Sequence, residues 1–349
     1  MNRIADWLQD NTAALVFTPT NRKYLTGFSS SLGYLLITKN HSYLFVDGRY
    51  FLAAKQSVKN CRVEVFGKIF ELLQQVIAKQ NIKTLLVENN ITVELFKTFN
   101  EWFLDCDVTC DGLTEKICEL RRTKTLSEID CVIKAQRIAE RALKEILNFI
   151  KPGVSEKRIA TELQYKMQLL GSEGEAFETI CVSGKKSAMP HGVPSEKLIE
   201  NGDFVTFDFG ATIDGYRSDM TRTFAVGYVT DKMQTVYDTV LKAQRCAEEV
   251  VKHGVKCRDV DFVARGVIES AGFKEYFTHS TGHGIGLDVH EAPNVSKASE
   301  TVLSAGDLIS DEPGIYIEDE FGVRIEDMLF VTENGSRNLT EFEKSLIIL

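Results

Sequence analysis

Histidines that could take part in chemistry gather in the second half of the chain. Five of the six lie in the stretch from His191 to His290. Three of these, His279, His283 and His290, stand within twelve residues in the run His-Ser-Thr-Gly-His-Gly-Ile-Gly-Leu-Asp-Val-His. The glycines beside His283 free its backbone to approach a site closely. A single histidine is most simply explained by a hydrogen-bonded structural role, but three in one Gly-rich run favour a functional site.

Two aspartates fall on a predicted β-hairpin. In Phe204-Val-Thr-Phe-Asp-Phe-Gly210, strand alternation places Asp208 on the face opposite the apolar side chains. Residues 211–216 can turn the chain, so that the strand over 217–226 brings Asp219 close to Asp208. Two carboxylates are costly to bury side by side unless a proton or a cation relieves their repulsion. Taken alone, the simpler interpretation is a pair of loop-edge aspartates bonded to turn amides.

A second predicted hairpin, over 307–317 and 322–330, adds two glutamates. Glu312 precedes Pro-Gly, a kink that can aim its side chain inward, and Arg324 and Glu326 share one strand face. Two hairpins that each present two acids are unusual for surface charge. Two further acids fall out of phase and are predicted to lie at the surface or behind the site: Asp311 and Asp327.

One imidazole with four carboxylates is a hard, oxygen-rich set of ligands. It suits two divalent ions that share bridging carboxylates, such as Mn(II), or Fe(II), Co(II) or Zn(II). It does not suit a structural zinc, which prefers Cys and His in closed tetrahedra. Because no redox motif accompanies the set, we expect hydrolysis, in which two ions hold a bridging water and polarise a carbonyl or phosphoryl oxygen. The remaining histidines would act on the substrate.

Composition excludes several other functions. The 349 residues include 41 Lys and Arg against 50 Asp and Glu, giving a net charge of −9, the wrong sign for a nucleic-acid or anionic-membrane binder. No apolar run approaches the roughly 18 residues of a membrane span, and the start lacks the features of a signal peptide. The eight scattered cysteines contain no Cys-x-x-Cys and indicate reduced thiols. We therefore expect a cytoplasmic protein.

The chain is predicted to divide near residue 120. Residues 1–120 alternate short β-like runs with helical spacing, which is typical of an α/β domain. The β-like runs are 14–17, 34–37, 42–46, 62–66 and 84–87, and the helical ones are 50–57, 68–80 and 92–104.

Residues 121–349 are predicted to form an α+β domain, with helices on one face of a largely antiparallel sheet. Ser127, with Asp130 three residues on, resembles a capping box that starts a helix. Further helices are predicted over 155–170, 232–252 and 258–271, and strands over 203–210, 217–226, 307–317 and 322–332.

These motifs resemble those of the pita-bread metallopeptidases, which include methionine aminopeptidase, aminopeptidase P and prolidase. The matching stretches are Phe-Asp-Phe-Gly, Ser-Asp-Met-Thr-Arg-Thr, the Gly-rich histidine run, Glu-Pro-Gly-Ile-Tyr and Val-Arg-Ile-Glu-Asp. The resemblance implies a pita-bread catalytic domain in which Asp219 and Glu326 bridge two divalent ions, with Mn(II) as the expected metal. It also implies that Asp208 binds one ion, that His283 and Glu312 bind the other, and that Glu312 is the general base.

The finer resemblance is to the proline-specific branch. His279 and Arg324 match that branch rather than methionine aminopeptidases, and the first domain resembles the N-terminal domain of aminopeptidase P, prolidase and creatinase. Its matching stretches are Asn21-Arg-Lys-Tyr-Leu-Thr-Gly-Phe28 and Phe45-Val-Asp-Gly-Arg-Tyr50. Ser310-Asp311 before Glu312 departs from the family pattern, where Thr and an apolar residue are usual.

The resemblance implies a Xaa-Pro aminopeptidase that acts on small peptides with proline in the second position. Catalytic or substrate-binding roles would fall to His191, His279, His290 and Arg324. The alternatives are a Xaa-Pro dipeptidase, a metal-independent creatinase-like carbon–nitrogen hydrolase, and a non-catalytic peptide-binding module. The intact set of ligands argues against the last two. Similar proteins are often homodimers, but this sequence contains no interface signature.

Overall fold

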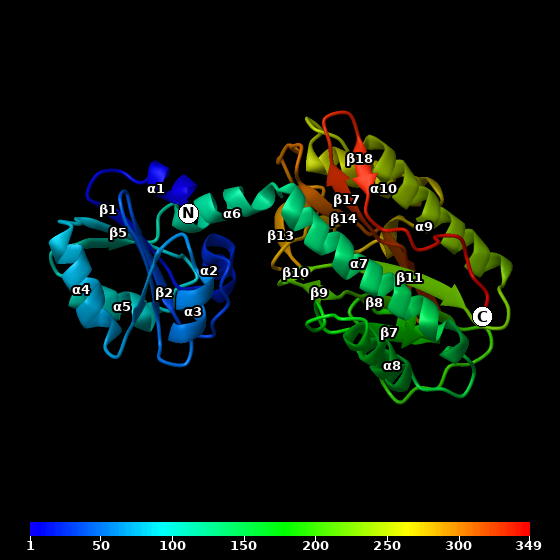
Figure 1. The fold of residues 1–349 in the computed structure, drawn as a ribbon. Helices are drawn as coiled ribbons and strands as arrows, with labels where there is room; N and C mark the ends of the chain where they lie inside the picture. Colours follow the sequence, from blue (N-terminus) through cyan, green and yellow to red (C-terminus); the bar gives the residue numbers. More distant parts are fainter. The chain divides into compact units, whose positions relative to one another are not determined.

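The computed structural model describes residues 1–349, which form two compact units (Figure 1). The N-terminal unit comprises Met1–Arg121 and the C-terminal unit Arg122–Leu349. The N-terminal unit contains the strands β1 (Thr12–Val16), β2 (Tyr34–Thr38), β3 (Ser42–Val46), β4 (Arg62–Val65), β5 (Thr84–Val87) and β6 (Asp107–Thr109). Its helices are α1 (Asn2–Trp7), α2 (Pro19–Thr26), α3 (Phe51–Ser57), α4 (Ile69–Lys79), α5 (Val93–Trp102) and α6 (Leu113–Arg122).

The N-terminal unit is a mixed sheet with helices on both faces, in the order β4-β3-β2-β1-β5-β6. Alternation along β1 sends Ala14 and Val16 to a core shared with α1, α2, α3 and α6. Ala13 and Leu15 face the opposite core, which α4 and α5 cover. The α/β prediction for this part of the chain is confirmed.

One helix of this unit, α2, buries polar side chains as well as apolar ones. In α2, Asn21 and Arg22 are buried, and Asn21 donates from Nδ2 to Oε1 of the buried Glu88 at 2.6 Å. Arg22 donates to the hydroxyl and carbonyl of Ser30. Because polar groups make these contacts, hydrophobic periodicity could not predict α2.

The C-terminal unit is α+β, as predicted, but its strands form several antiparallel sheets rather than one. The sheets have the orders β11-β8-β7, β13-β12-β14-β17-β18, β10-β9 and β15-β16. Their strands are β7 (Ile180–Ser183), β8 (Phe204–Phe209), β9 (Thr212–Ile213), β10 (Tyr216–Arg217), β11 (Met220–Ala225), β12 (Gly282–Gly284), β13 (Glu291–Val295), β14 (Leu308–Asp311), β15 (Gly314–Ile317), β16 (Phe321–Arg324), β17 (Asp327–Val331) and β18 (Ser336–Asn338). The α-helices are α7 (Leu126–Ile146), α8 (Glu156–Leu169), α9 (Asp231–Val250) and α10 (Cys257–Ser270), and the 3-10 helices are η1 (Leu147–Phe149), η2 (Gly184–Ala188) and η3 (Lys274–Tyr276).

Two pairs of helices cover these sheets. Helices α7 and α8 lie over the sheet formed by β7, β8 and β11 (Figure 1). Side chains such as Ile146, Leu163 and Phe207 form the core between them. Helices α9 and α10 bury residues such as Val240 and Val260 against other strands. None of the helices is both long and apolar enough to cross a membrane. All eight cysteines are free.

The predicted hairpin over 307–317 and 322–330 is divided between two sheets. Its outer parts, β14 and β17, pair within the five-stranded sheet, and its tip forms β15 and β16. The strands break at Glu312-Pro313 on one side and at Ile325-Glu326 on the other. Pro313 has no N–H to donate to a ladder, so a break there costs no hydrogen bond. Both glutamates therefore lie at strand interruptions, not on a continuous strand face.

The cap of α7 also differs from the prediction. The N-cap is Thr125 rather than Ser127, because Thr125 Oγ1 accepts from the Glu128 N–H while the Glu128 carboxylate accepts from the Thr125 N–H. The Thr-x-x-Glu spacing is the true capping box. Ser127 lies within the first turn of the helix.

We expect Thr125→Ala to lower the free energy of unfolding by about 1 kcal/mol, because it removes the hydroxyl of the N-cap. The matched variant Ser127→Ala should change it by less than about 0.5 kcal/mol. Urea titrations of both variants measure the difference. A larger loss in Ser127→Ala would contradict this assignment of the cap.

Candidate metal centre

The structure brings all nine predicted site residues to one cavity of the C-terminal unit. The cavity has a volume of about 590 Å³. The nine residues in its lining are His191, Asp208, Asp219, His279, His283, His290, Glu312, Arg324 and Glu326.

Two aspartates come from neighbouring antiparallel strands. Asp208 lies on β8 opposite Thr221 of β11, and Asp219 directly precedes β11. This register brings the two carboxylates to the same end of the strand pair, as the predicted hairpin requires. The Oδ1 atom of each aspartate is buried and has no hydrogen-bond partner in the protein.

His283 is held with one ring nitrogen toward the acids. Its Nδ1 lies 3.1 Å from the carbonyl oxygen of Gly284, while Nε2 lies 3.2 Å from Glu312 Oε1 and 3.8 Å from Asp219 Oδ2. The glycine before it is required by crowding, because a Cβ atom on Gly282 would lie 2.0 Å from the backbone oxygen of Ser310. The Gly-rich run thus lets β12 approach β14 closely.

Glu326 completes the cluster from the break between β16 and β17. Its side chain is buried, and its Oε2 accepts a hydrogen bond of 2.7 Å from Thr221 Oγ1. One ligand atom from each of Asp219, His283 and Glu326 lies within 4.8 Å of the others. These three residues form a site of the size that a metal ion can occupy.

The electrostatics of the cluster favour a bound cation. Burial, reinforced by neighbouring carboxylates, raises the pKa of Asp219 and of Glu326 well above the ordinary range. Burial alone would lower the pKa of His283, but its hydrogen bond and attraction to Glu312 raise it to about 9. Two buried aspartates have oxygen atoms without hydrogen-bond partners, and an imidazole and two more carboxylates lie beside them. This set of donors fits a divalent metal ion, which would coordinate the oxygen atoms and neutralise their charge.

Arg324 links the acids to a second group of polar side chains. Its guanidinium donates to Asp208 Oδ2 at 2.6 Å, to Thr221 Oγ1 at 3.1 Å and to the Tyr316 hydroxyl at 2.8 Å. The Tyr316 oxygen also lies 2.8 Å from His279 Nε2. Sequence reasoning missed Tyr316 and Thr221. The sequence does indicate a position near the site for Thr221, because strand alternation places it on the same face as Asp219.

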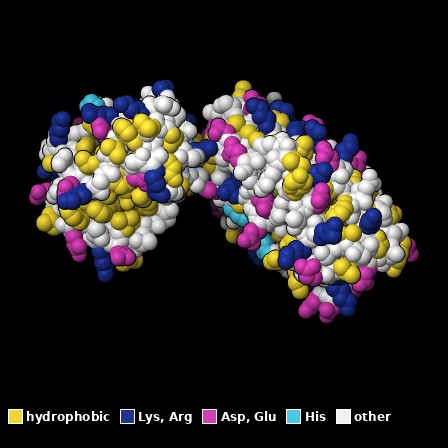
Figure 2. All heavy atoms as spheres, turned by 60° about the horizontal axis from the view of Figure 1, so that its bottom comes forward, with side chains coloured by type: hydrophobic (Ala, Val, Ile, Leu, Met, Phe, Trp, Pro, Cys, Tyr) yellow, Lys and Arg dark blue, Asp and Glu magenta, His cyan; other side chains and the backbone are white.

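The other two histidines are more exposed. The His290 ring lies edge-on to His283 with centroids 4.2 Å apart, and His191 lies on the loop that follows η2. Both histidines are exposed, and both line the cavity. Figure 2 shows histidine side chains at the surface of the C-terminal unit, among acidic and basic groups.

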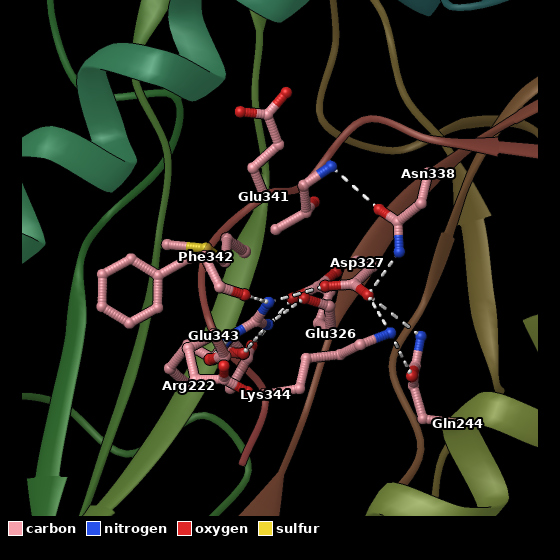
Figure 3. A network of polar contacts seen from close by, with 12 residues as sticks. Arg222, Gln244, Glu326, Asp327, Asn338, Glu341, Phe342, Glu343 and Lys344 are labelled. Atoms are coloured by element: carbon pink, nitrogen blue, oxygen red, sulfur yellow. Dashed lines mark hydrogen bonds and ion pairs between the residues drawn. The ribbon is translucent and has the colours of Figure 1, made fainter. Parts of the chain in front are cut away.

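A network of charges lies behind Glu326 (Figure 3). Arg222 donates to the Glu326 backbone oxygen at 2.6 Å and to Asp327 Oδ1 at 2.8 Å, and Lys344 Nζ lies 2.7 Å from Asp327 Oδ2. Asp311 and Asp327 are fully buried, so the surface alternative predicted for them is wrong. The two residues lie opposite each other on the paired strands β14 and β17, so the register of these strands determines their position.

Two family sequence models match the chain. The creatinase/prolidase N-terminal domain matches residues 1–123, and metallopeptidase family M24 matches residues 130–333. A Xaa-Pro dipeptidase of Pyrococcus furiosus is 37% identical over 99% of both chains. The solved Xaa-Pro dipeptidase from Bacillus anthracis has a TM-score of 0.94 at 40% identity, covering 97% of this chain and 95% of that one. X-Pro aminopeptidase from Thermotoga maritima has a TM-score of 0.93 at 35% identity, covering 99% and 100%.

We expect Asp219→Asn to lose most of its bound metal while it remains folded, because an amide cannot supply an anionic ligand. Added Mn(II) should raise the melting temperature of the unmodified protein but not that of the variant, since a ligand stabilises only the state that binds it. Elemental analysis and thermal melting measure both effects, with the exposed Asp130→Asn as the control. Full metal occupancy in Asp219→Asn would remove this residue from the site.

Proposed function

The chain belongs to metallopeptidase family M24, and from this premise we propose that it is an exopeptidase that hydrolyses Xaa-Pro peptide bonds with divalent metal ions. The observation that carries the proposal is the single buried cluster of four carboxylates and one imidazole. Relatives named Xaa-Pro dipeptidase and X-Pro aminopeptidase, similar over nearly the whole chain, support the choice of substrate.

The donor set supports two ions. Asp219 and Glu326, which lie together with His283, would be shared by both ions, with Asp208 completing one site and Glu312 the other. Ions held there supply a Lewis acid for the scissile carbonyl and lower the pKa of water. We propose Mn(II), because carboxylate oxygens suit it.

Glu312 is the residue that we propose as the proton acceptor. Its carboxylate lines the cavity beside His283, with Oε1 3.2 Å from the histidine Nε2. There it can accept a proton from a water molecule. We propose that His290 contacts the peptide at the reacting bond, which its position next to His283 in the cavity lining supports.

Recognition of proline must rely on shape, since a Xaa-Pro bond has no N–H to donate. His279 offers an apolar ring surface, packed edge-on against Phe277 with centroids 5.1 Å apart. Burial lowers its pKa, which favours the neutral imidazole. Tyr316 and Arg324 fix the position of this ring through the Tyr316 hydroxyl. We propose that His279 forms part of the proline pocket.

The loop that carries His191 is fixed at both ends by one carboxylate. Glu156, fully buried, accepts hydrogen bonds from the backbone N–H and the hydroxyl of Ser183 and of Ser195. Lys186 adds an ion pair at 2.8 Å. We infer that Glu156 is a positioning residue that holds His191 at the edge of the cavity.

The free cysteines and the composition support a cytoplasmic enzyme that binds neither nucleic acid nor membranes. A Xaa-Pro dipeptidase is the second candidate, favoured by the names of relatives such as the Pyrococcus furiosus protein. Peptide length separates the two activities.

The proposal is tested with protein that has been stripped by a chelator and then supplied with Mn(II). We expect Ala-Pro-Ala to be cleaved to free alanine only after the metal is restored, and about 100-fold faster than Ala-Ala-Ala, within the range that pocket shape supplies. No cleavage of any Xaa-Pro peptide would contradict the proposed function. Equal cleavage of Ala-Ala-Ala would overturn proline specificity, and metal-independent hydrolysis of creatine would favour the creatinase-like alternative.

We expect Glu156→Gln to lower kcat/KM on Xaa-Pro peptides about tenfold with metal content unchanged, because it weakens charge-assisted hydrogen bonds to the loop. In a His191→Ala background the same substitution should cost less than about twofold, since the loop no longer carries its functional side chain. Kinetics of the two single variants and the double variant form the measurement. Equal losses in both backgrounds would show that Glu156 does not act through His191.

A further inference from the structure

A second cavity adjoins the metal cavity in the C-terminal unit. We call it the side groove. It has a volume of about 990 Å³, and Pro190 and His191 line both cavities. Tyr316 also lines the side groove, while its hydroxyl contacts His279 and Arg324 in the metal cavity. The side groove therefore begins at the residues that we assign to proline recognition.

The side groove has the size and surface of a peptide subsite. Cavities that bind small ligands have volumes of about 300–1,000 Å³ and combine apolar surface with a few polar groups. Here Met189 and Tyr276, 59% and 37% exposed, supply apolar surface in the lining. A dipeptide that ends at proline would leave this space empty, whereas a longer peptide could continue into it.

The charge of the side groove is predominantly negative. Three exposed carboxylates line it and form no hydrogen bond or ion pair with the protein: Glu275, Glu318 and Asp319. Of its two lysines, Lys186 is already paired with Glu156 and also donates to the Val193 backbone oxygen. Lys185 is the one unpaired ammonium in the lining. Three unpaired carboxylates against one ammonium favour a cationic side chain in the groove.

We propose that the side groove binds the side chain of the residue that follows proline, and that it favours Lys or Arg there. The proposal rests on the proposed Xaa-Pro activity and names its substrate class. Lys185 is the group available to the carboxylate at the end of a tripeptide, while the three acids receive the basic side chain.

The experiment compares kcat/KM on Ala-Pro, Ala-Pro-Arg, Ala-Pro-Ala and Ala-Pro-Glu with the Mn(II)-loaded protein at low salt. We expect the tripeptides to exceed the dipeptide, and the arginine peptide to exceed the glutamate peptide about threefold to tenfold, the size of exposed charge interactions. High salt should reduce this ratio through screening.

A combined variant, Glu275→Gln with Glu318→Gln and Asp319→Asn, should bring the arginine-to-glutamate ratio of kcat/KM to within about twofold, with metal content unchanged. The matched control is Glu320→Gln. This residue neighbours Asp319 in sequence but pairs with Lys232 and does not line the groove, so the ratio should be unchanged.

The outcomes separate this inference from the proposed function. Faster cleavage of Ala-Pro than of all tripeptides, or equal rates on the arginine and glutamate peptides, would overturn the inference and leave the Xaa-Pro activity standing. Loss of the ratio in Glu320→Gln as well would also overturn it. If none of the Xaa-Pro peptides is cleaved, both proposals fail.

Discussion

Repulsion between buried carboxylates is the constraint on which the catalytic unit depends. Asp208, Asp219, Glu312 and Glu326 face one cavity, where Arg324 and His283 are the nearby basic groups. An uncompensated charge in such a site would cost several kcal/mol, which a fold of ordinary stability does not tolerate. Divalent ions resolve the conflict, because they neutralise the charge and satisfy the oxygen atoms that the protein leaves without partners.

The architecture holds these four acids close together, although Arg324 and His283 compensate only part of their charge. Strand breaks at Glu312-Pro313 and before β17 turn two glutamates inward, and Gly282 allows the histidine strand to approach. Behind the cluster, Arg222 and Lys344 neutralise Asp327 and tie the strand that follows Glu326 to the C-terminal segment (Figure 3). The protein's own cations thus neutralise Asp327 behind the cluster. The negative charge of the acids that line the cavity remains available to bind metal ions and substrate.

Much of this arrangement could be predicted from the sequence, because strand alternation and glycine spacing are local signals. The hairpin predicted from the sequence correctly brings Asp208 and Asp219 to the same end of a strand pair. Local signals failed where tertiary contacts decide. The burial of Asp327 depends on Arg222 and Lys344, which are distant in sequence, and Tyr316 has a role only through its contacts with His279 and Arg324. The cap of α7 was misplaced because Ser127 and Thr125 offer similar signals, and the reciprocal bond to Glu128 selects Thr125.

Anomalous X-ray diffraction from crystals soaked in Mn(II) tests the central claim most directly, because it locates the ions independently of activity. The account predicts two peaks in each chain, both within coordinating distance of Asp219 and Glu326, with His283 and Glu312 at one and Asp208 at the other. Crystals at saturating Mn(II) with no peak among these five residues would contradict it, since the buried carboxylates would then be stabilised by protons alone.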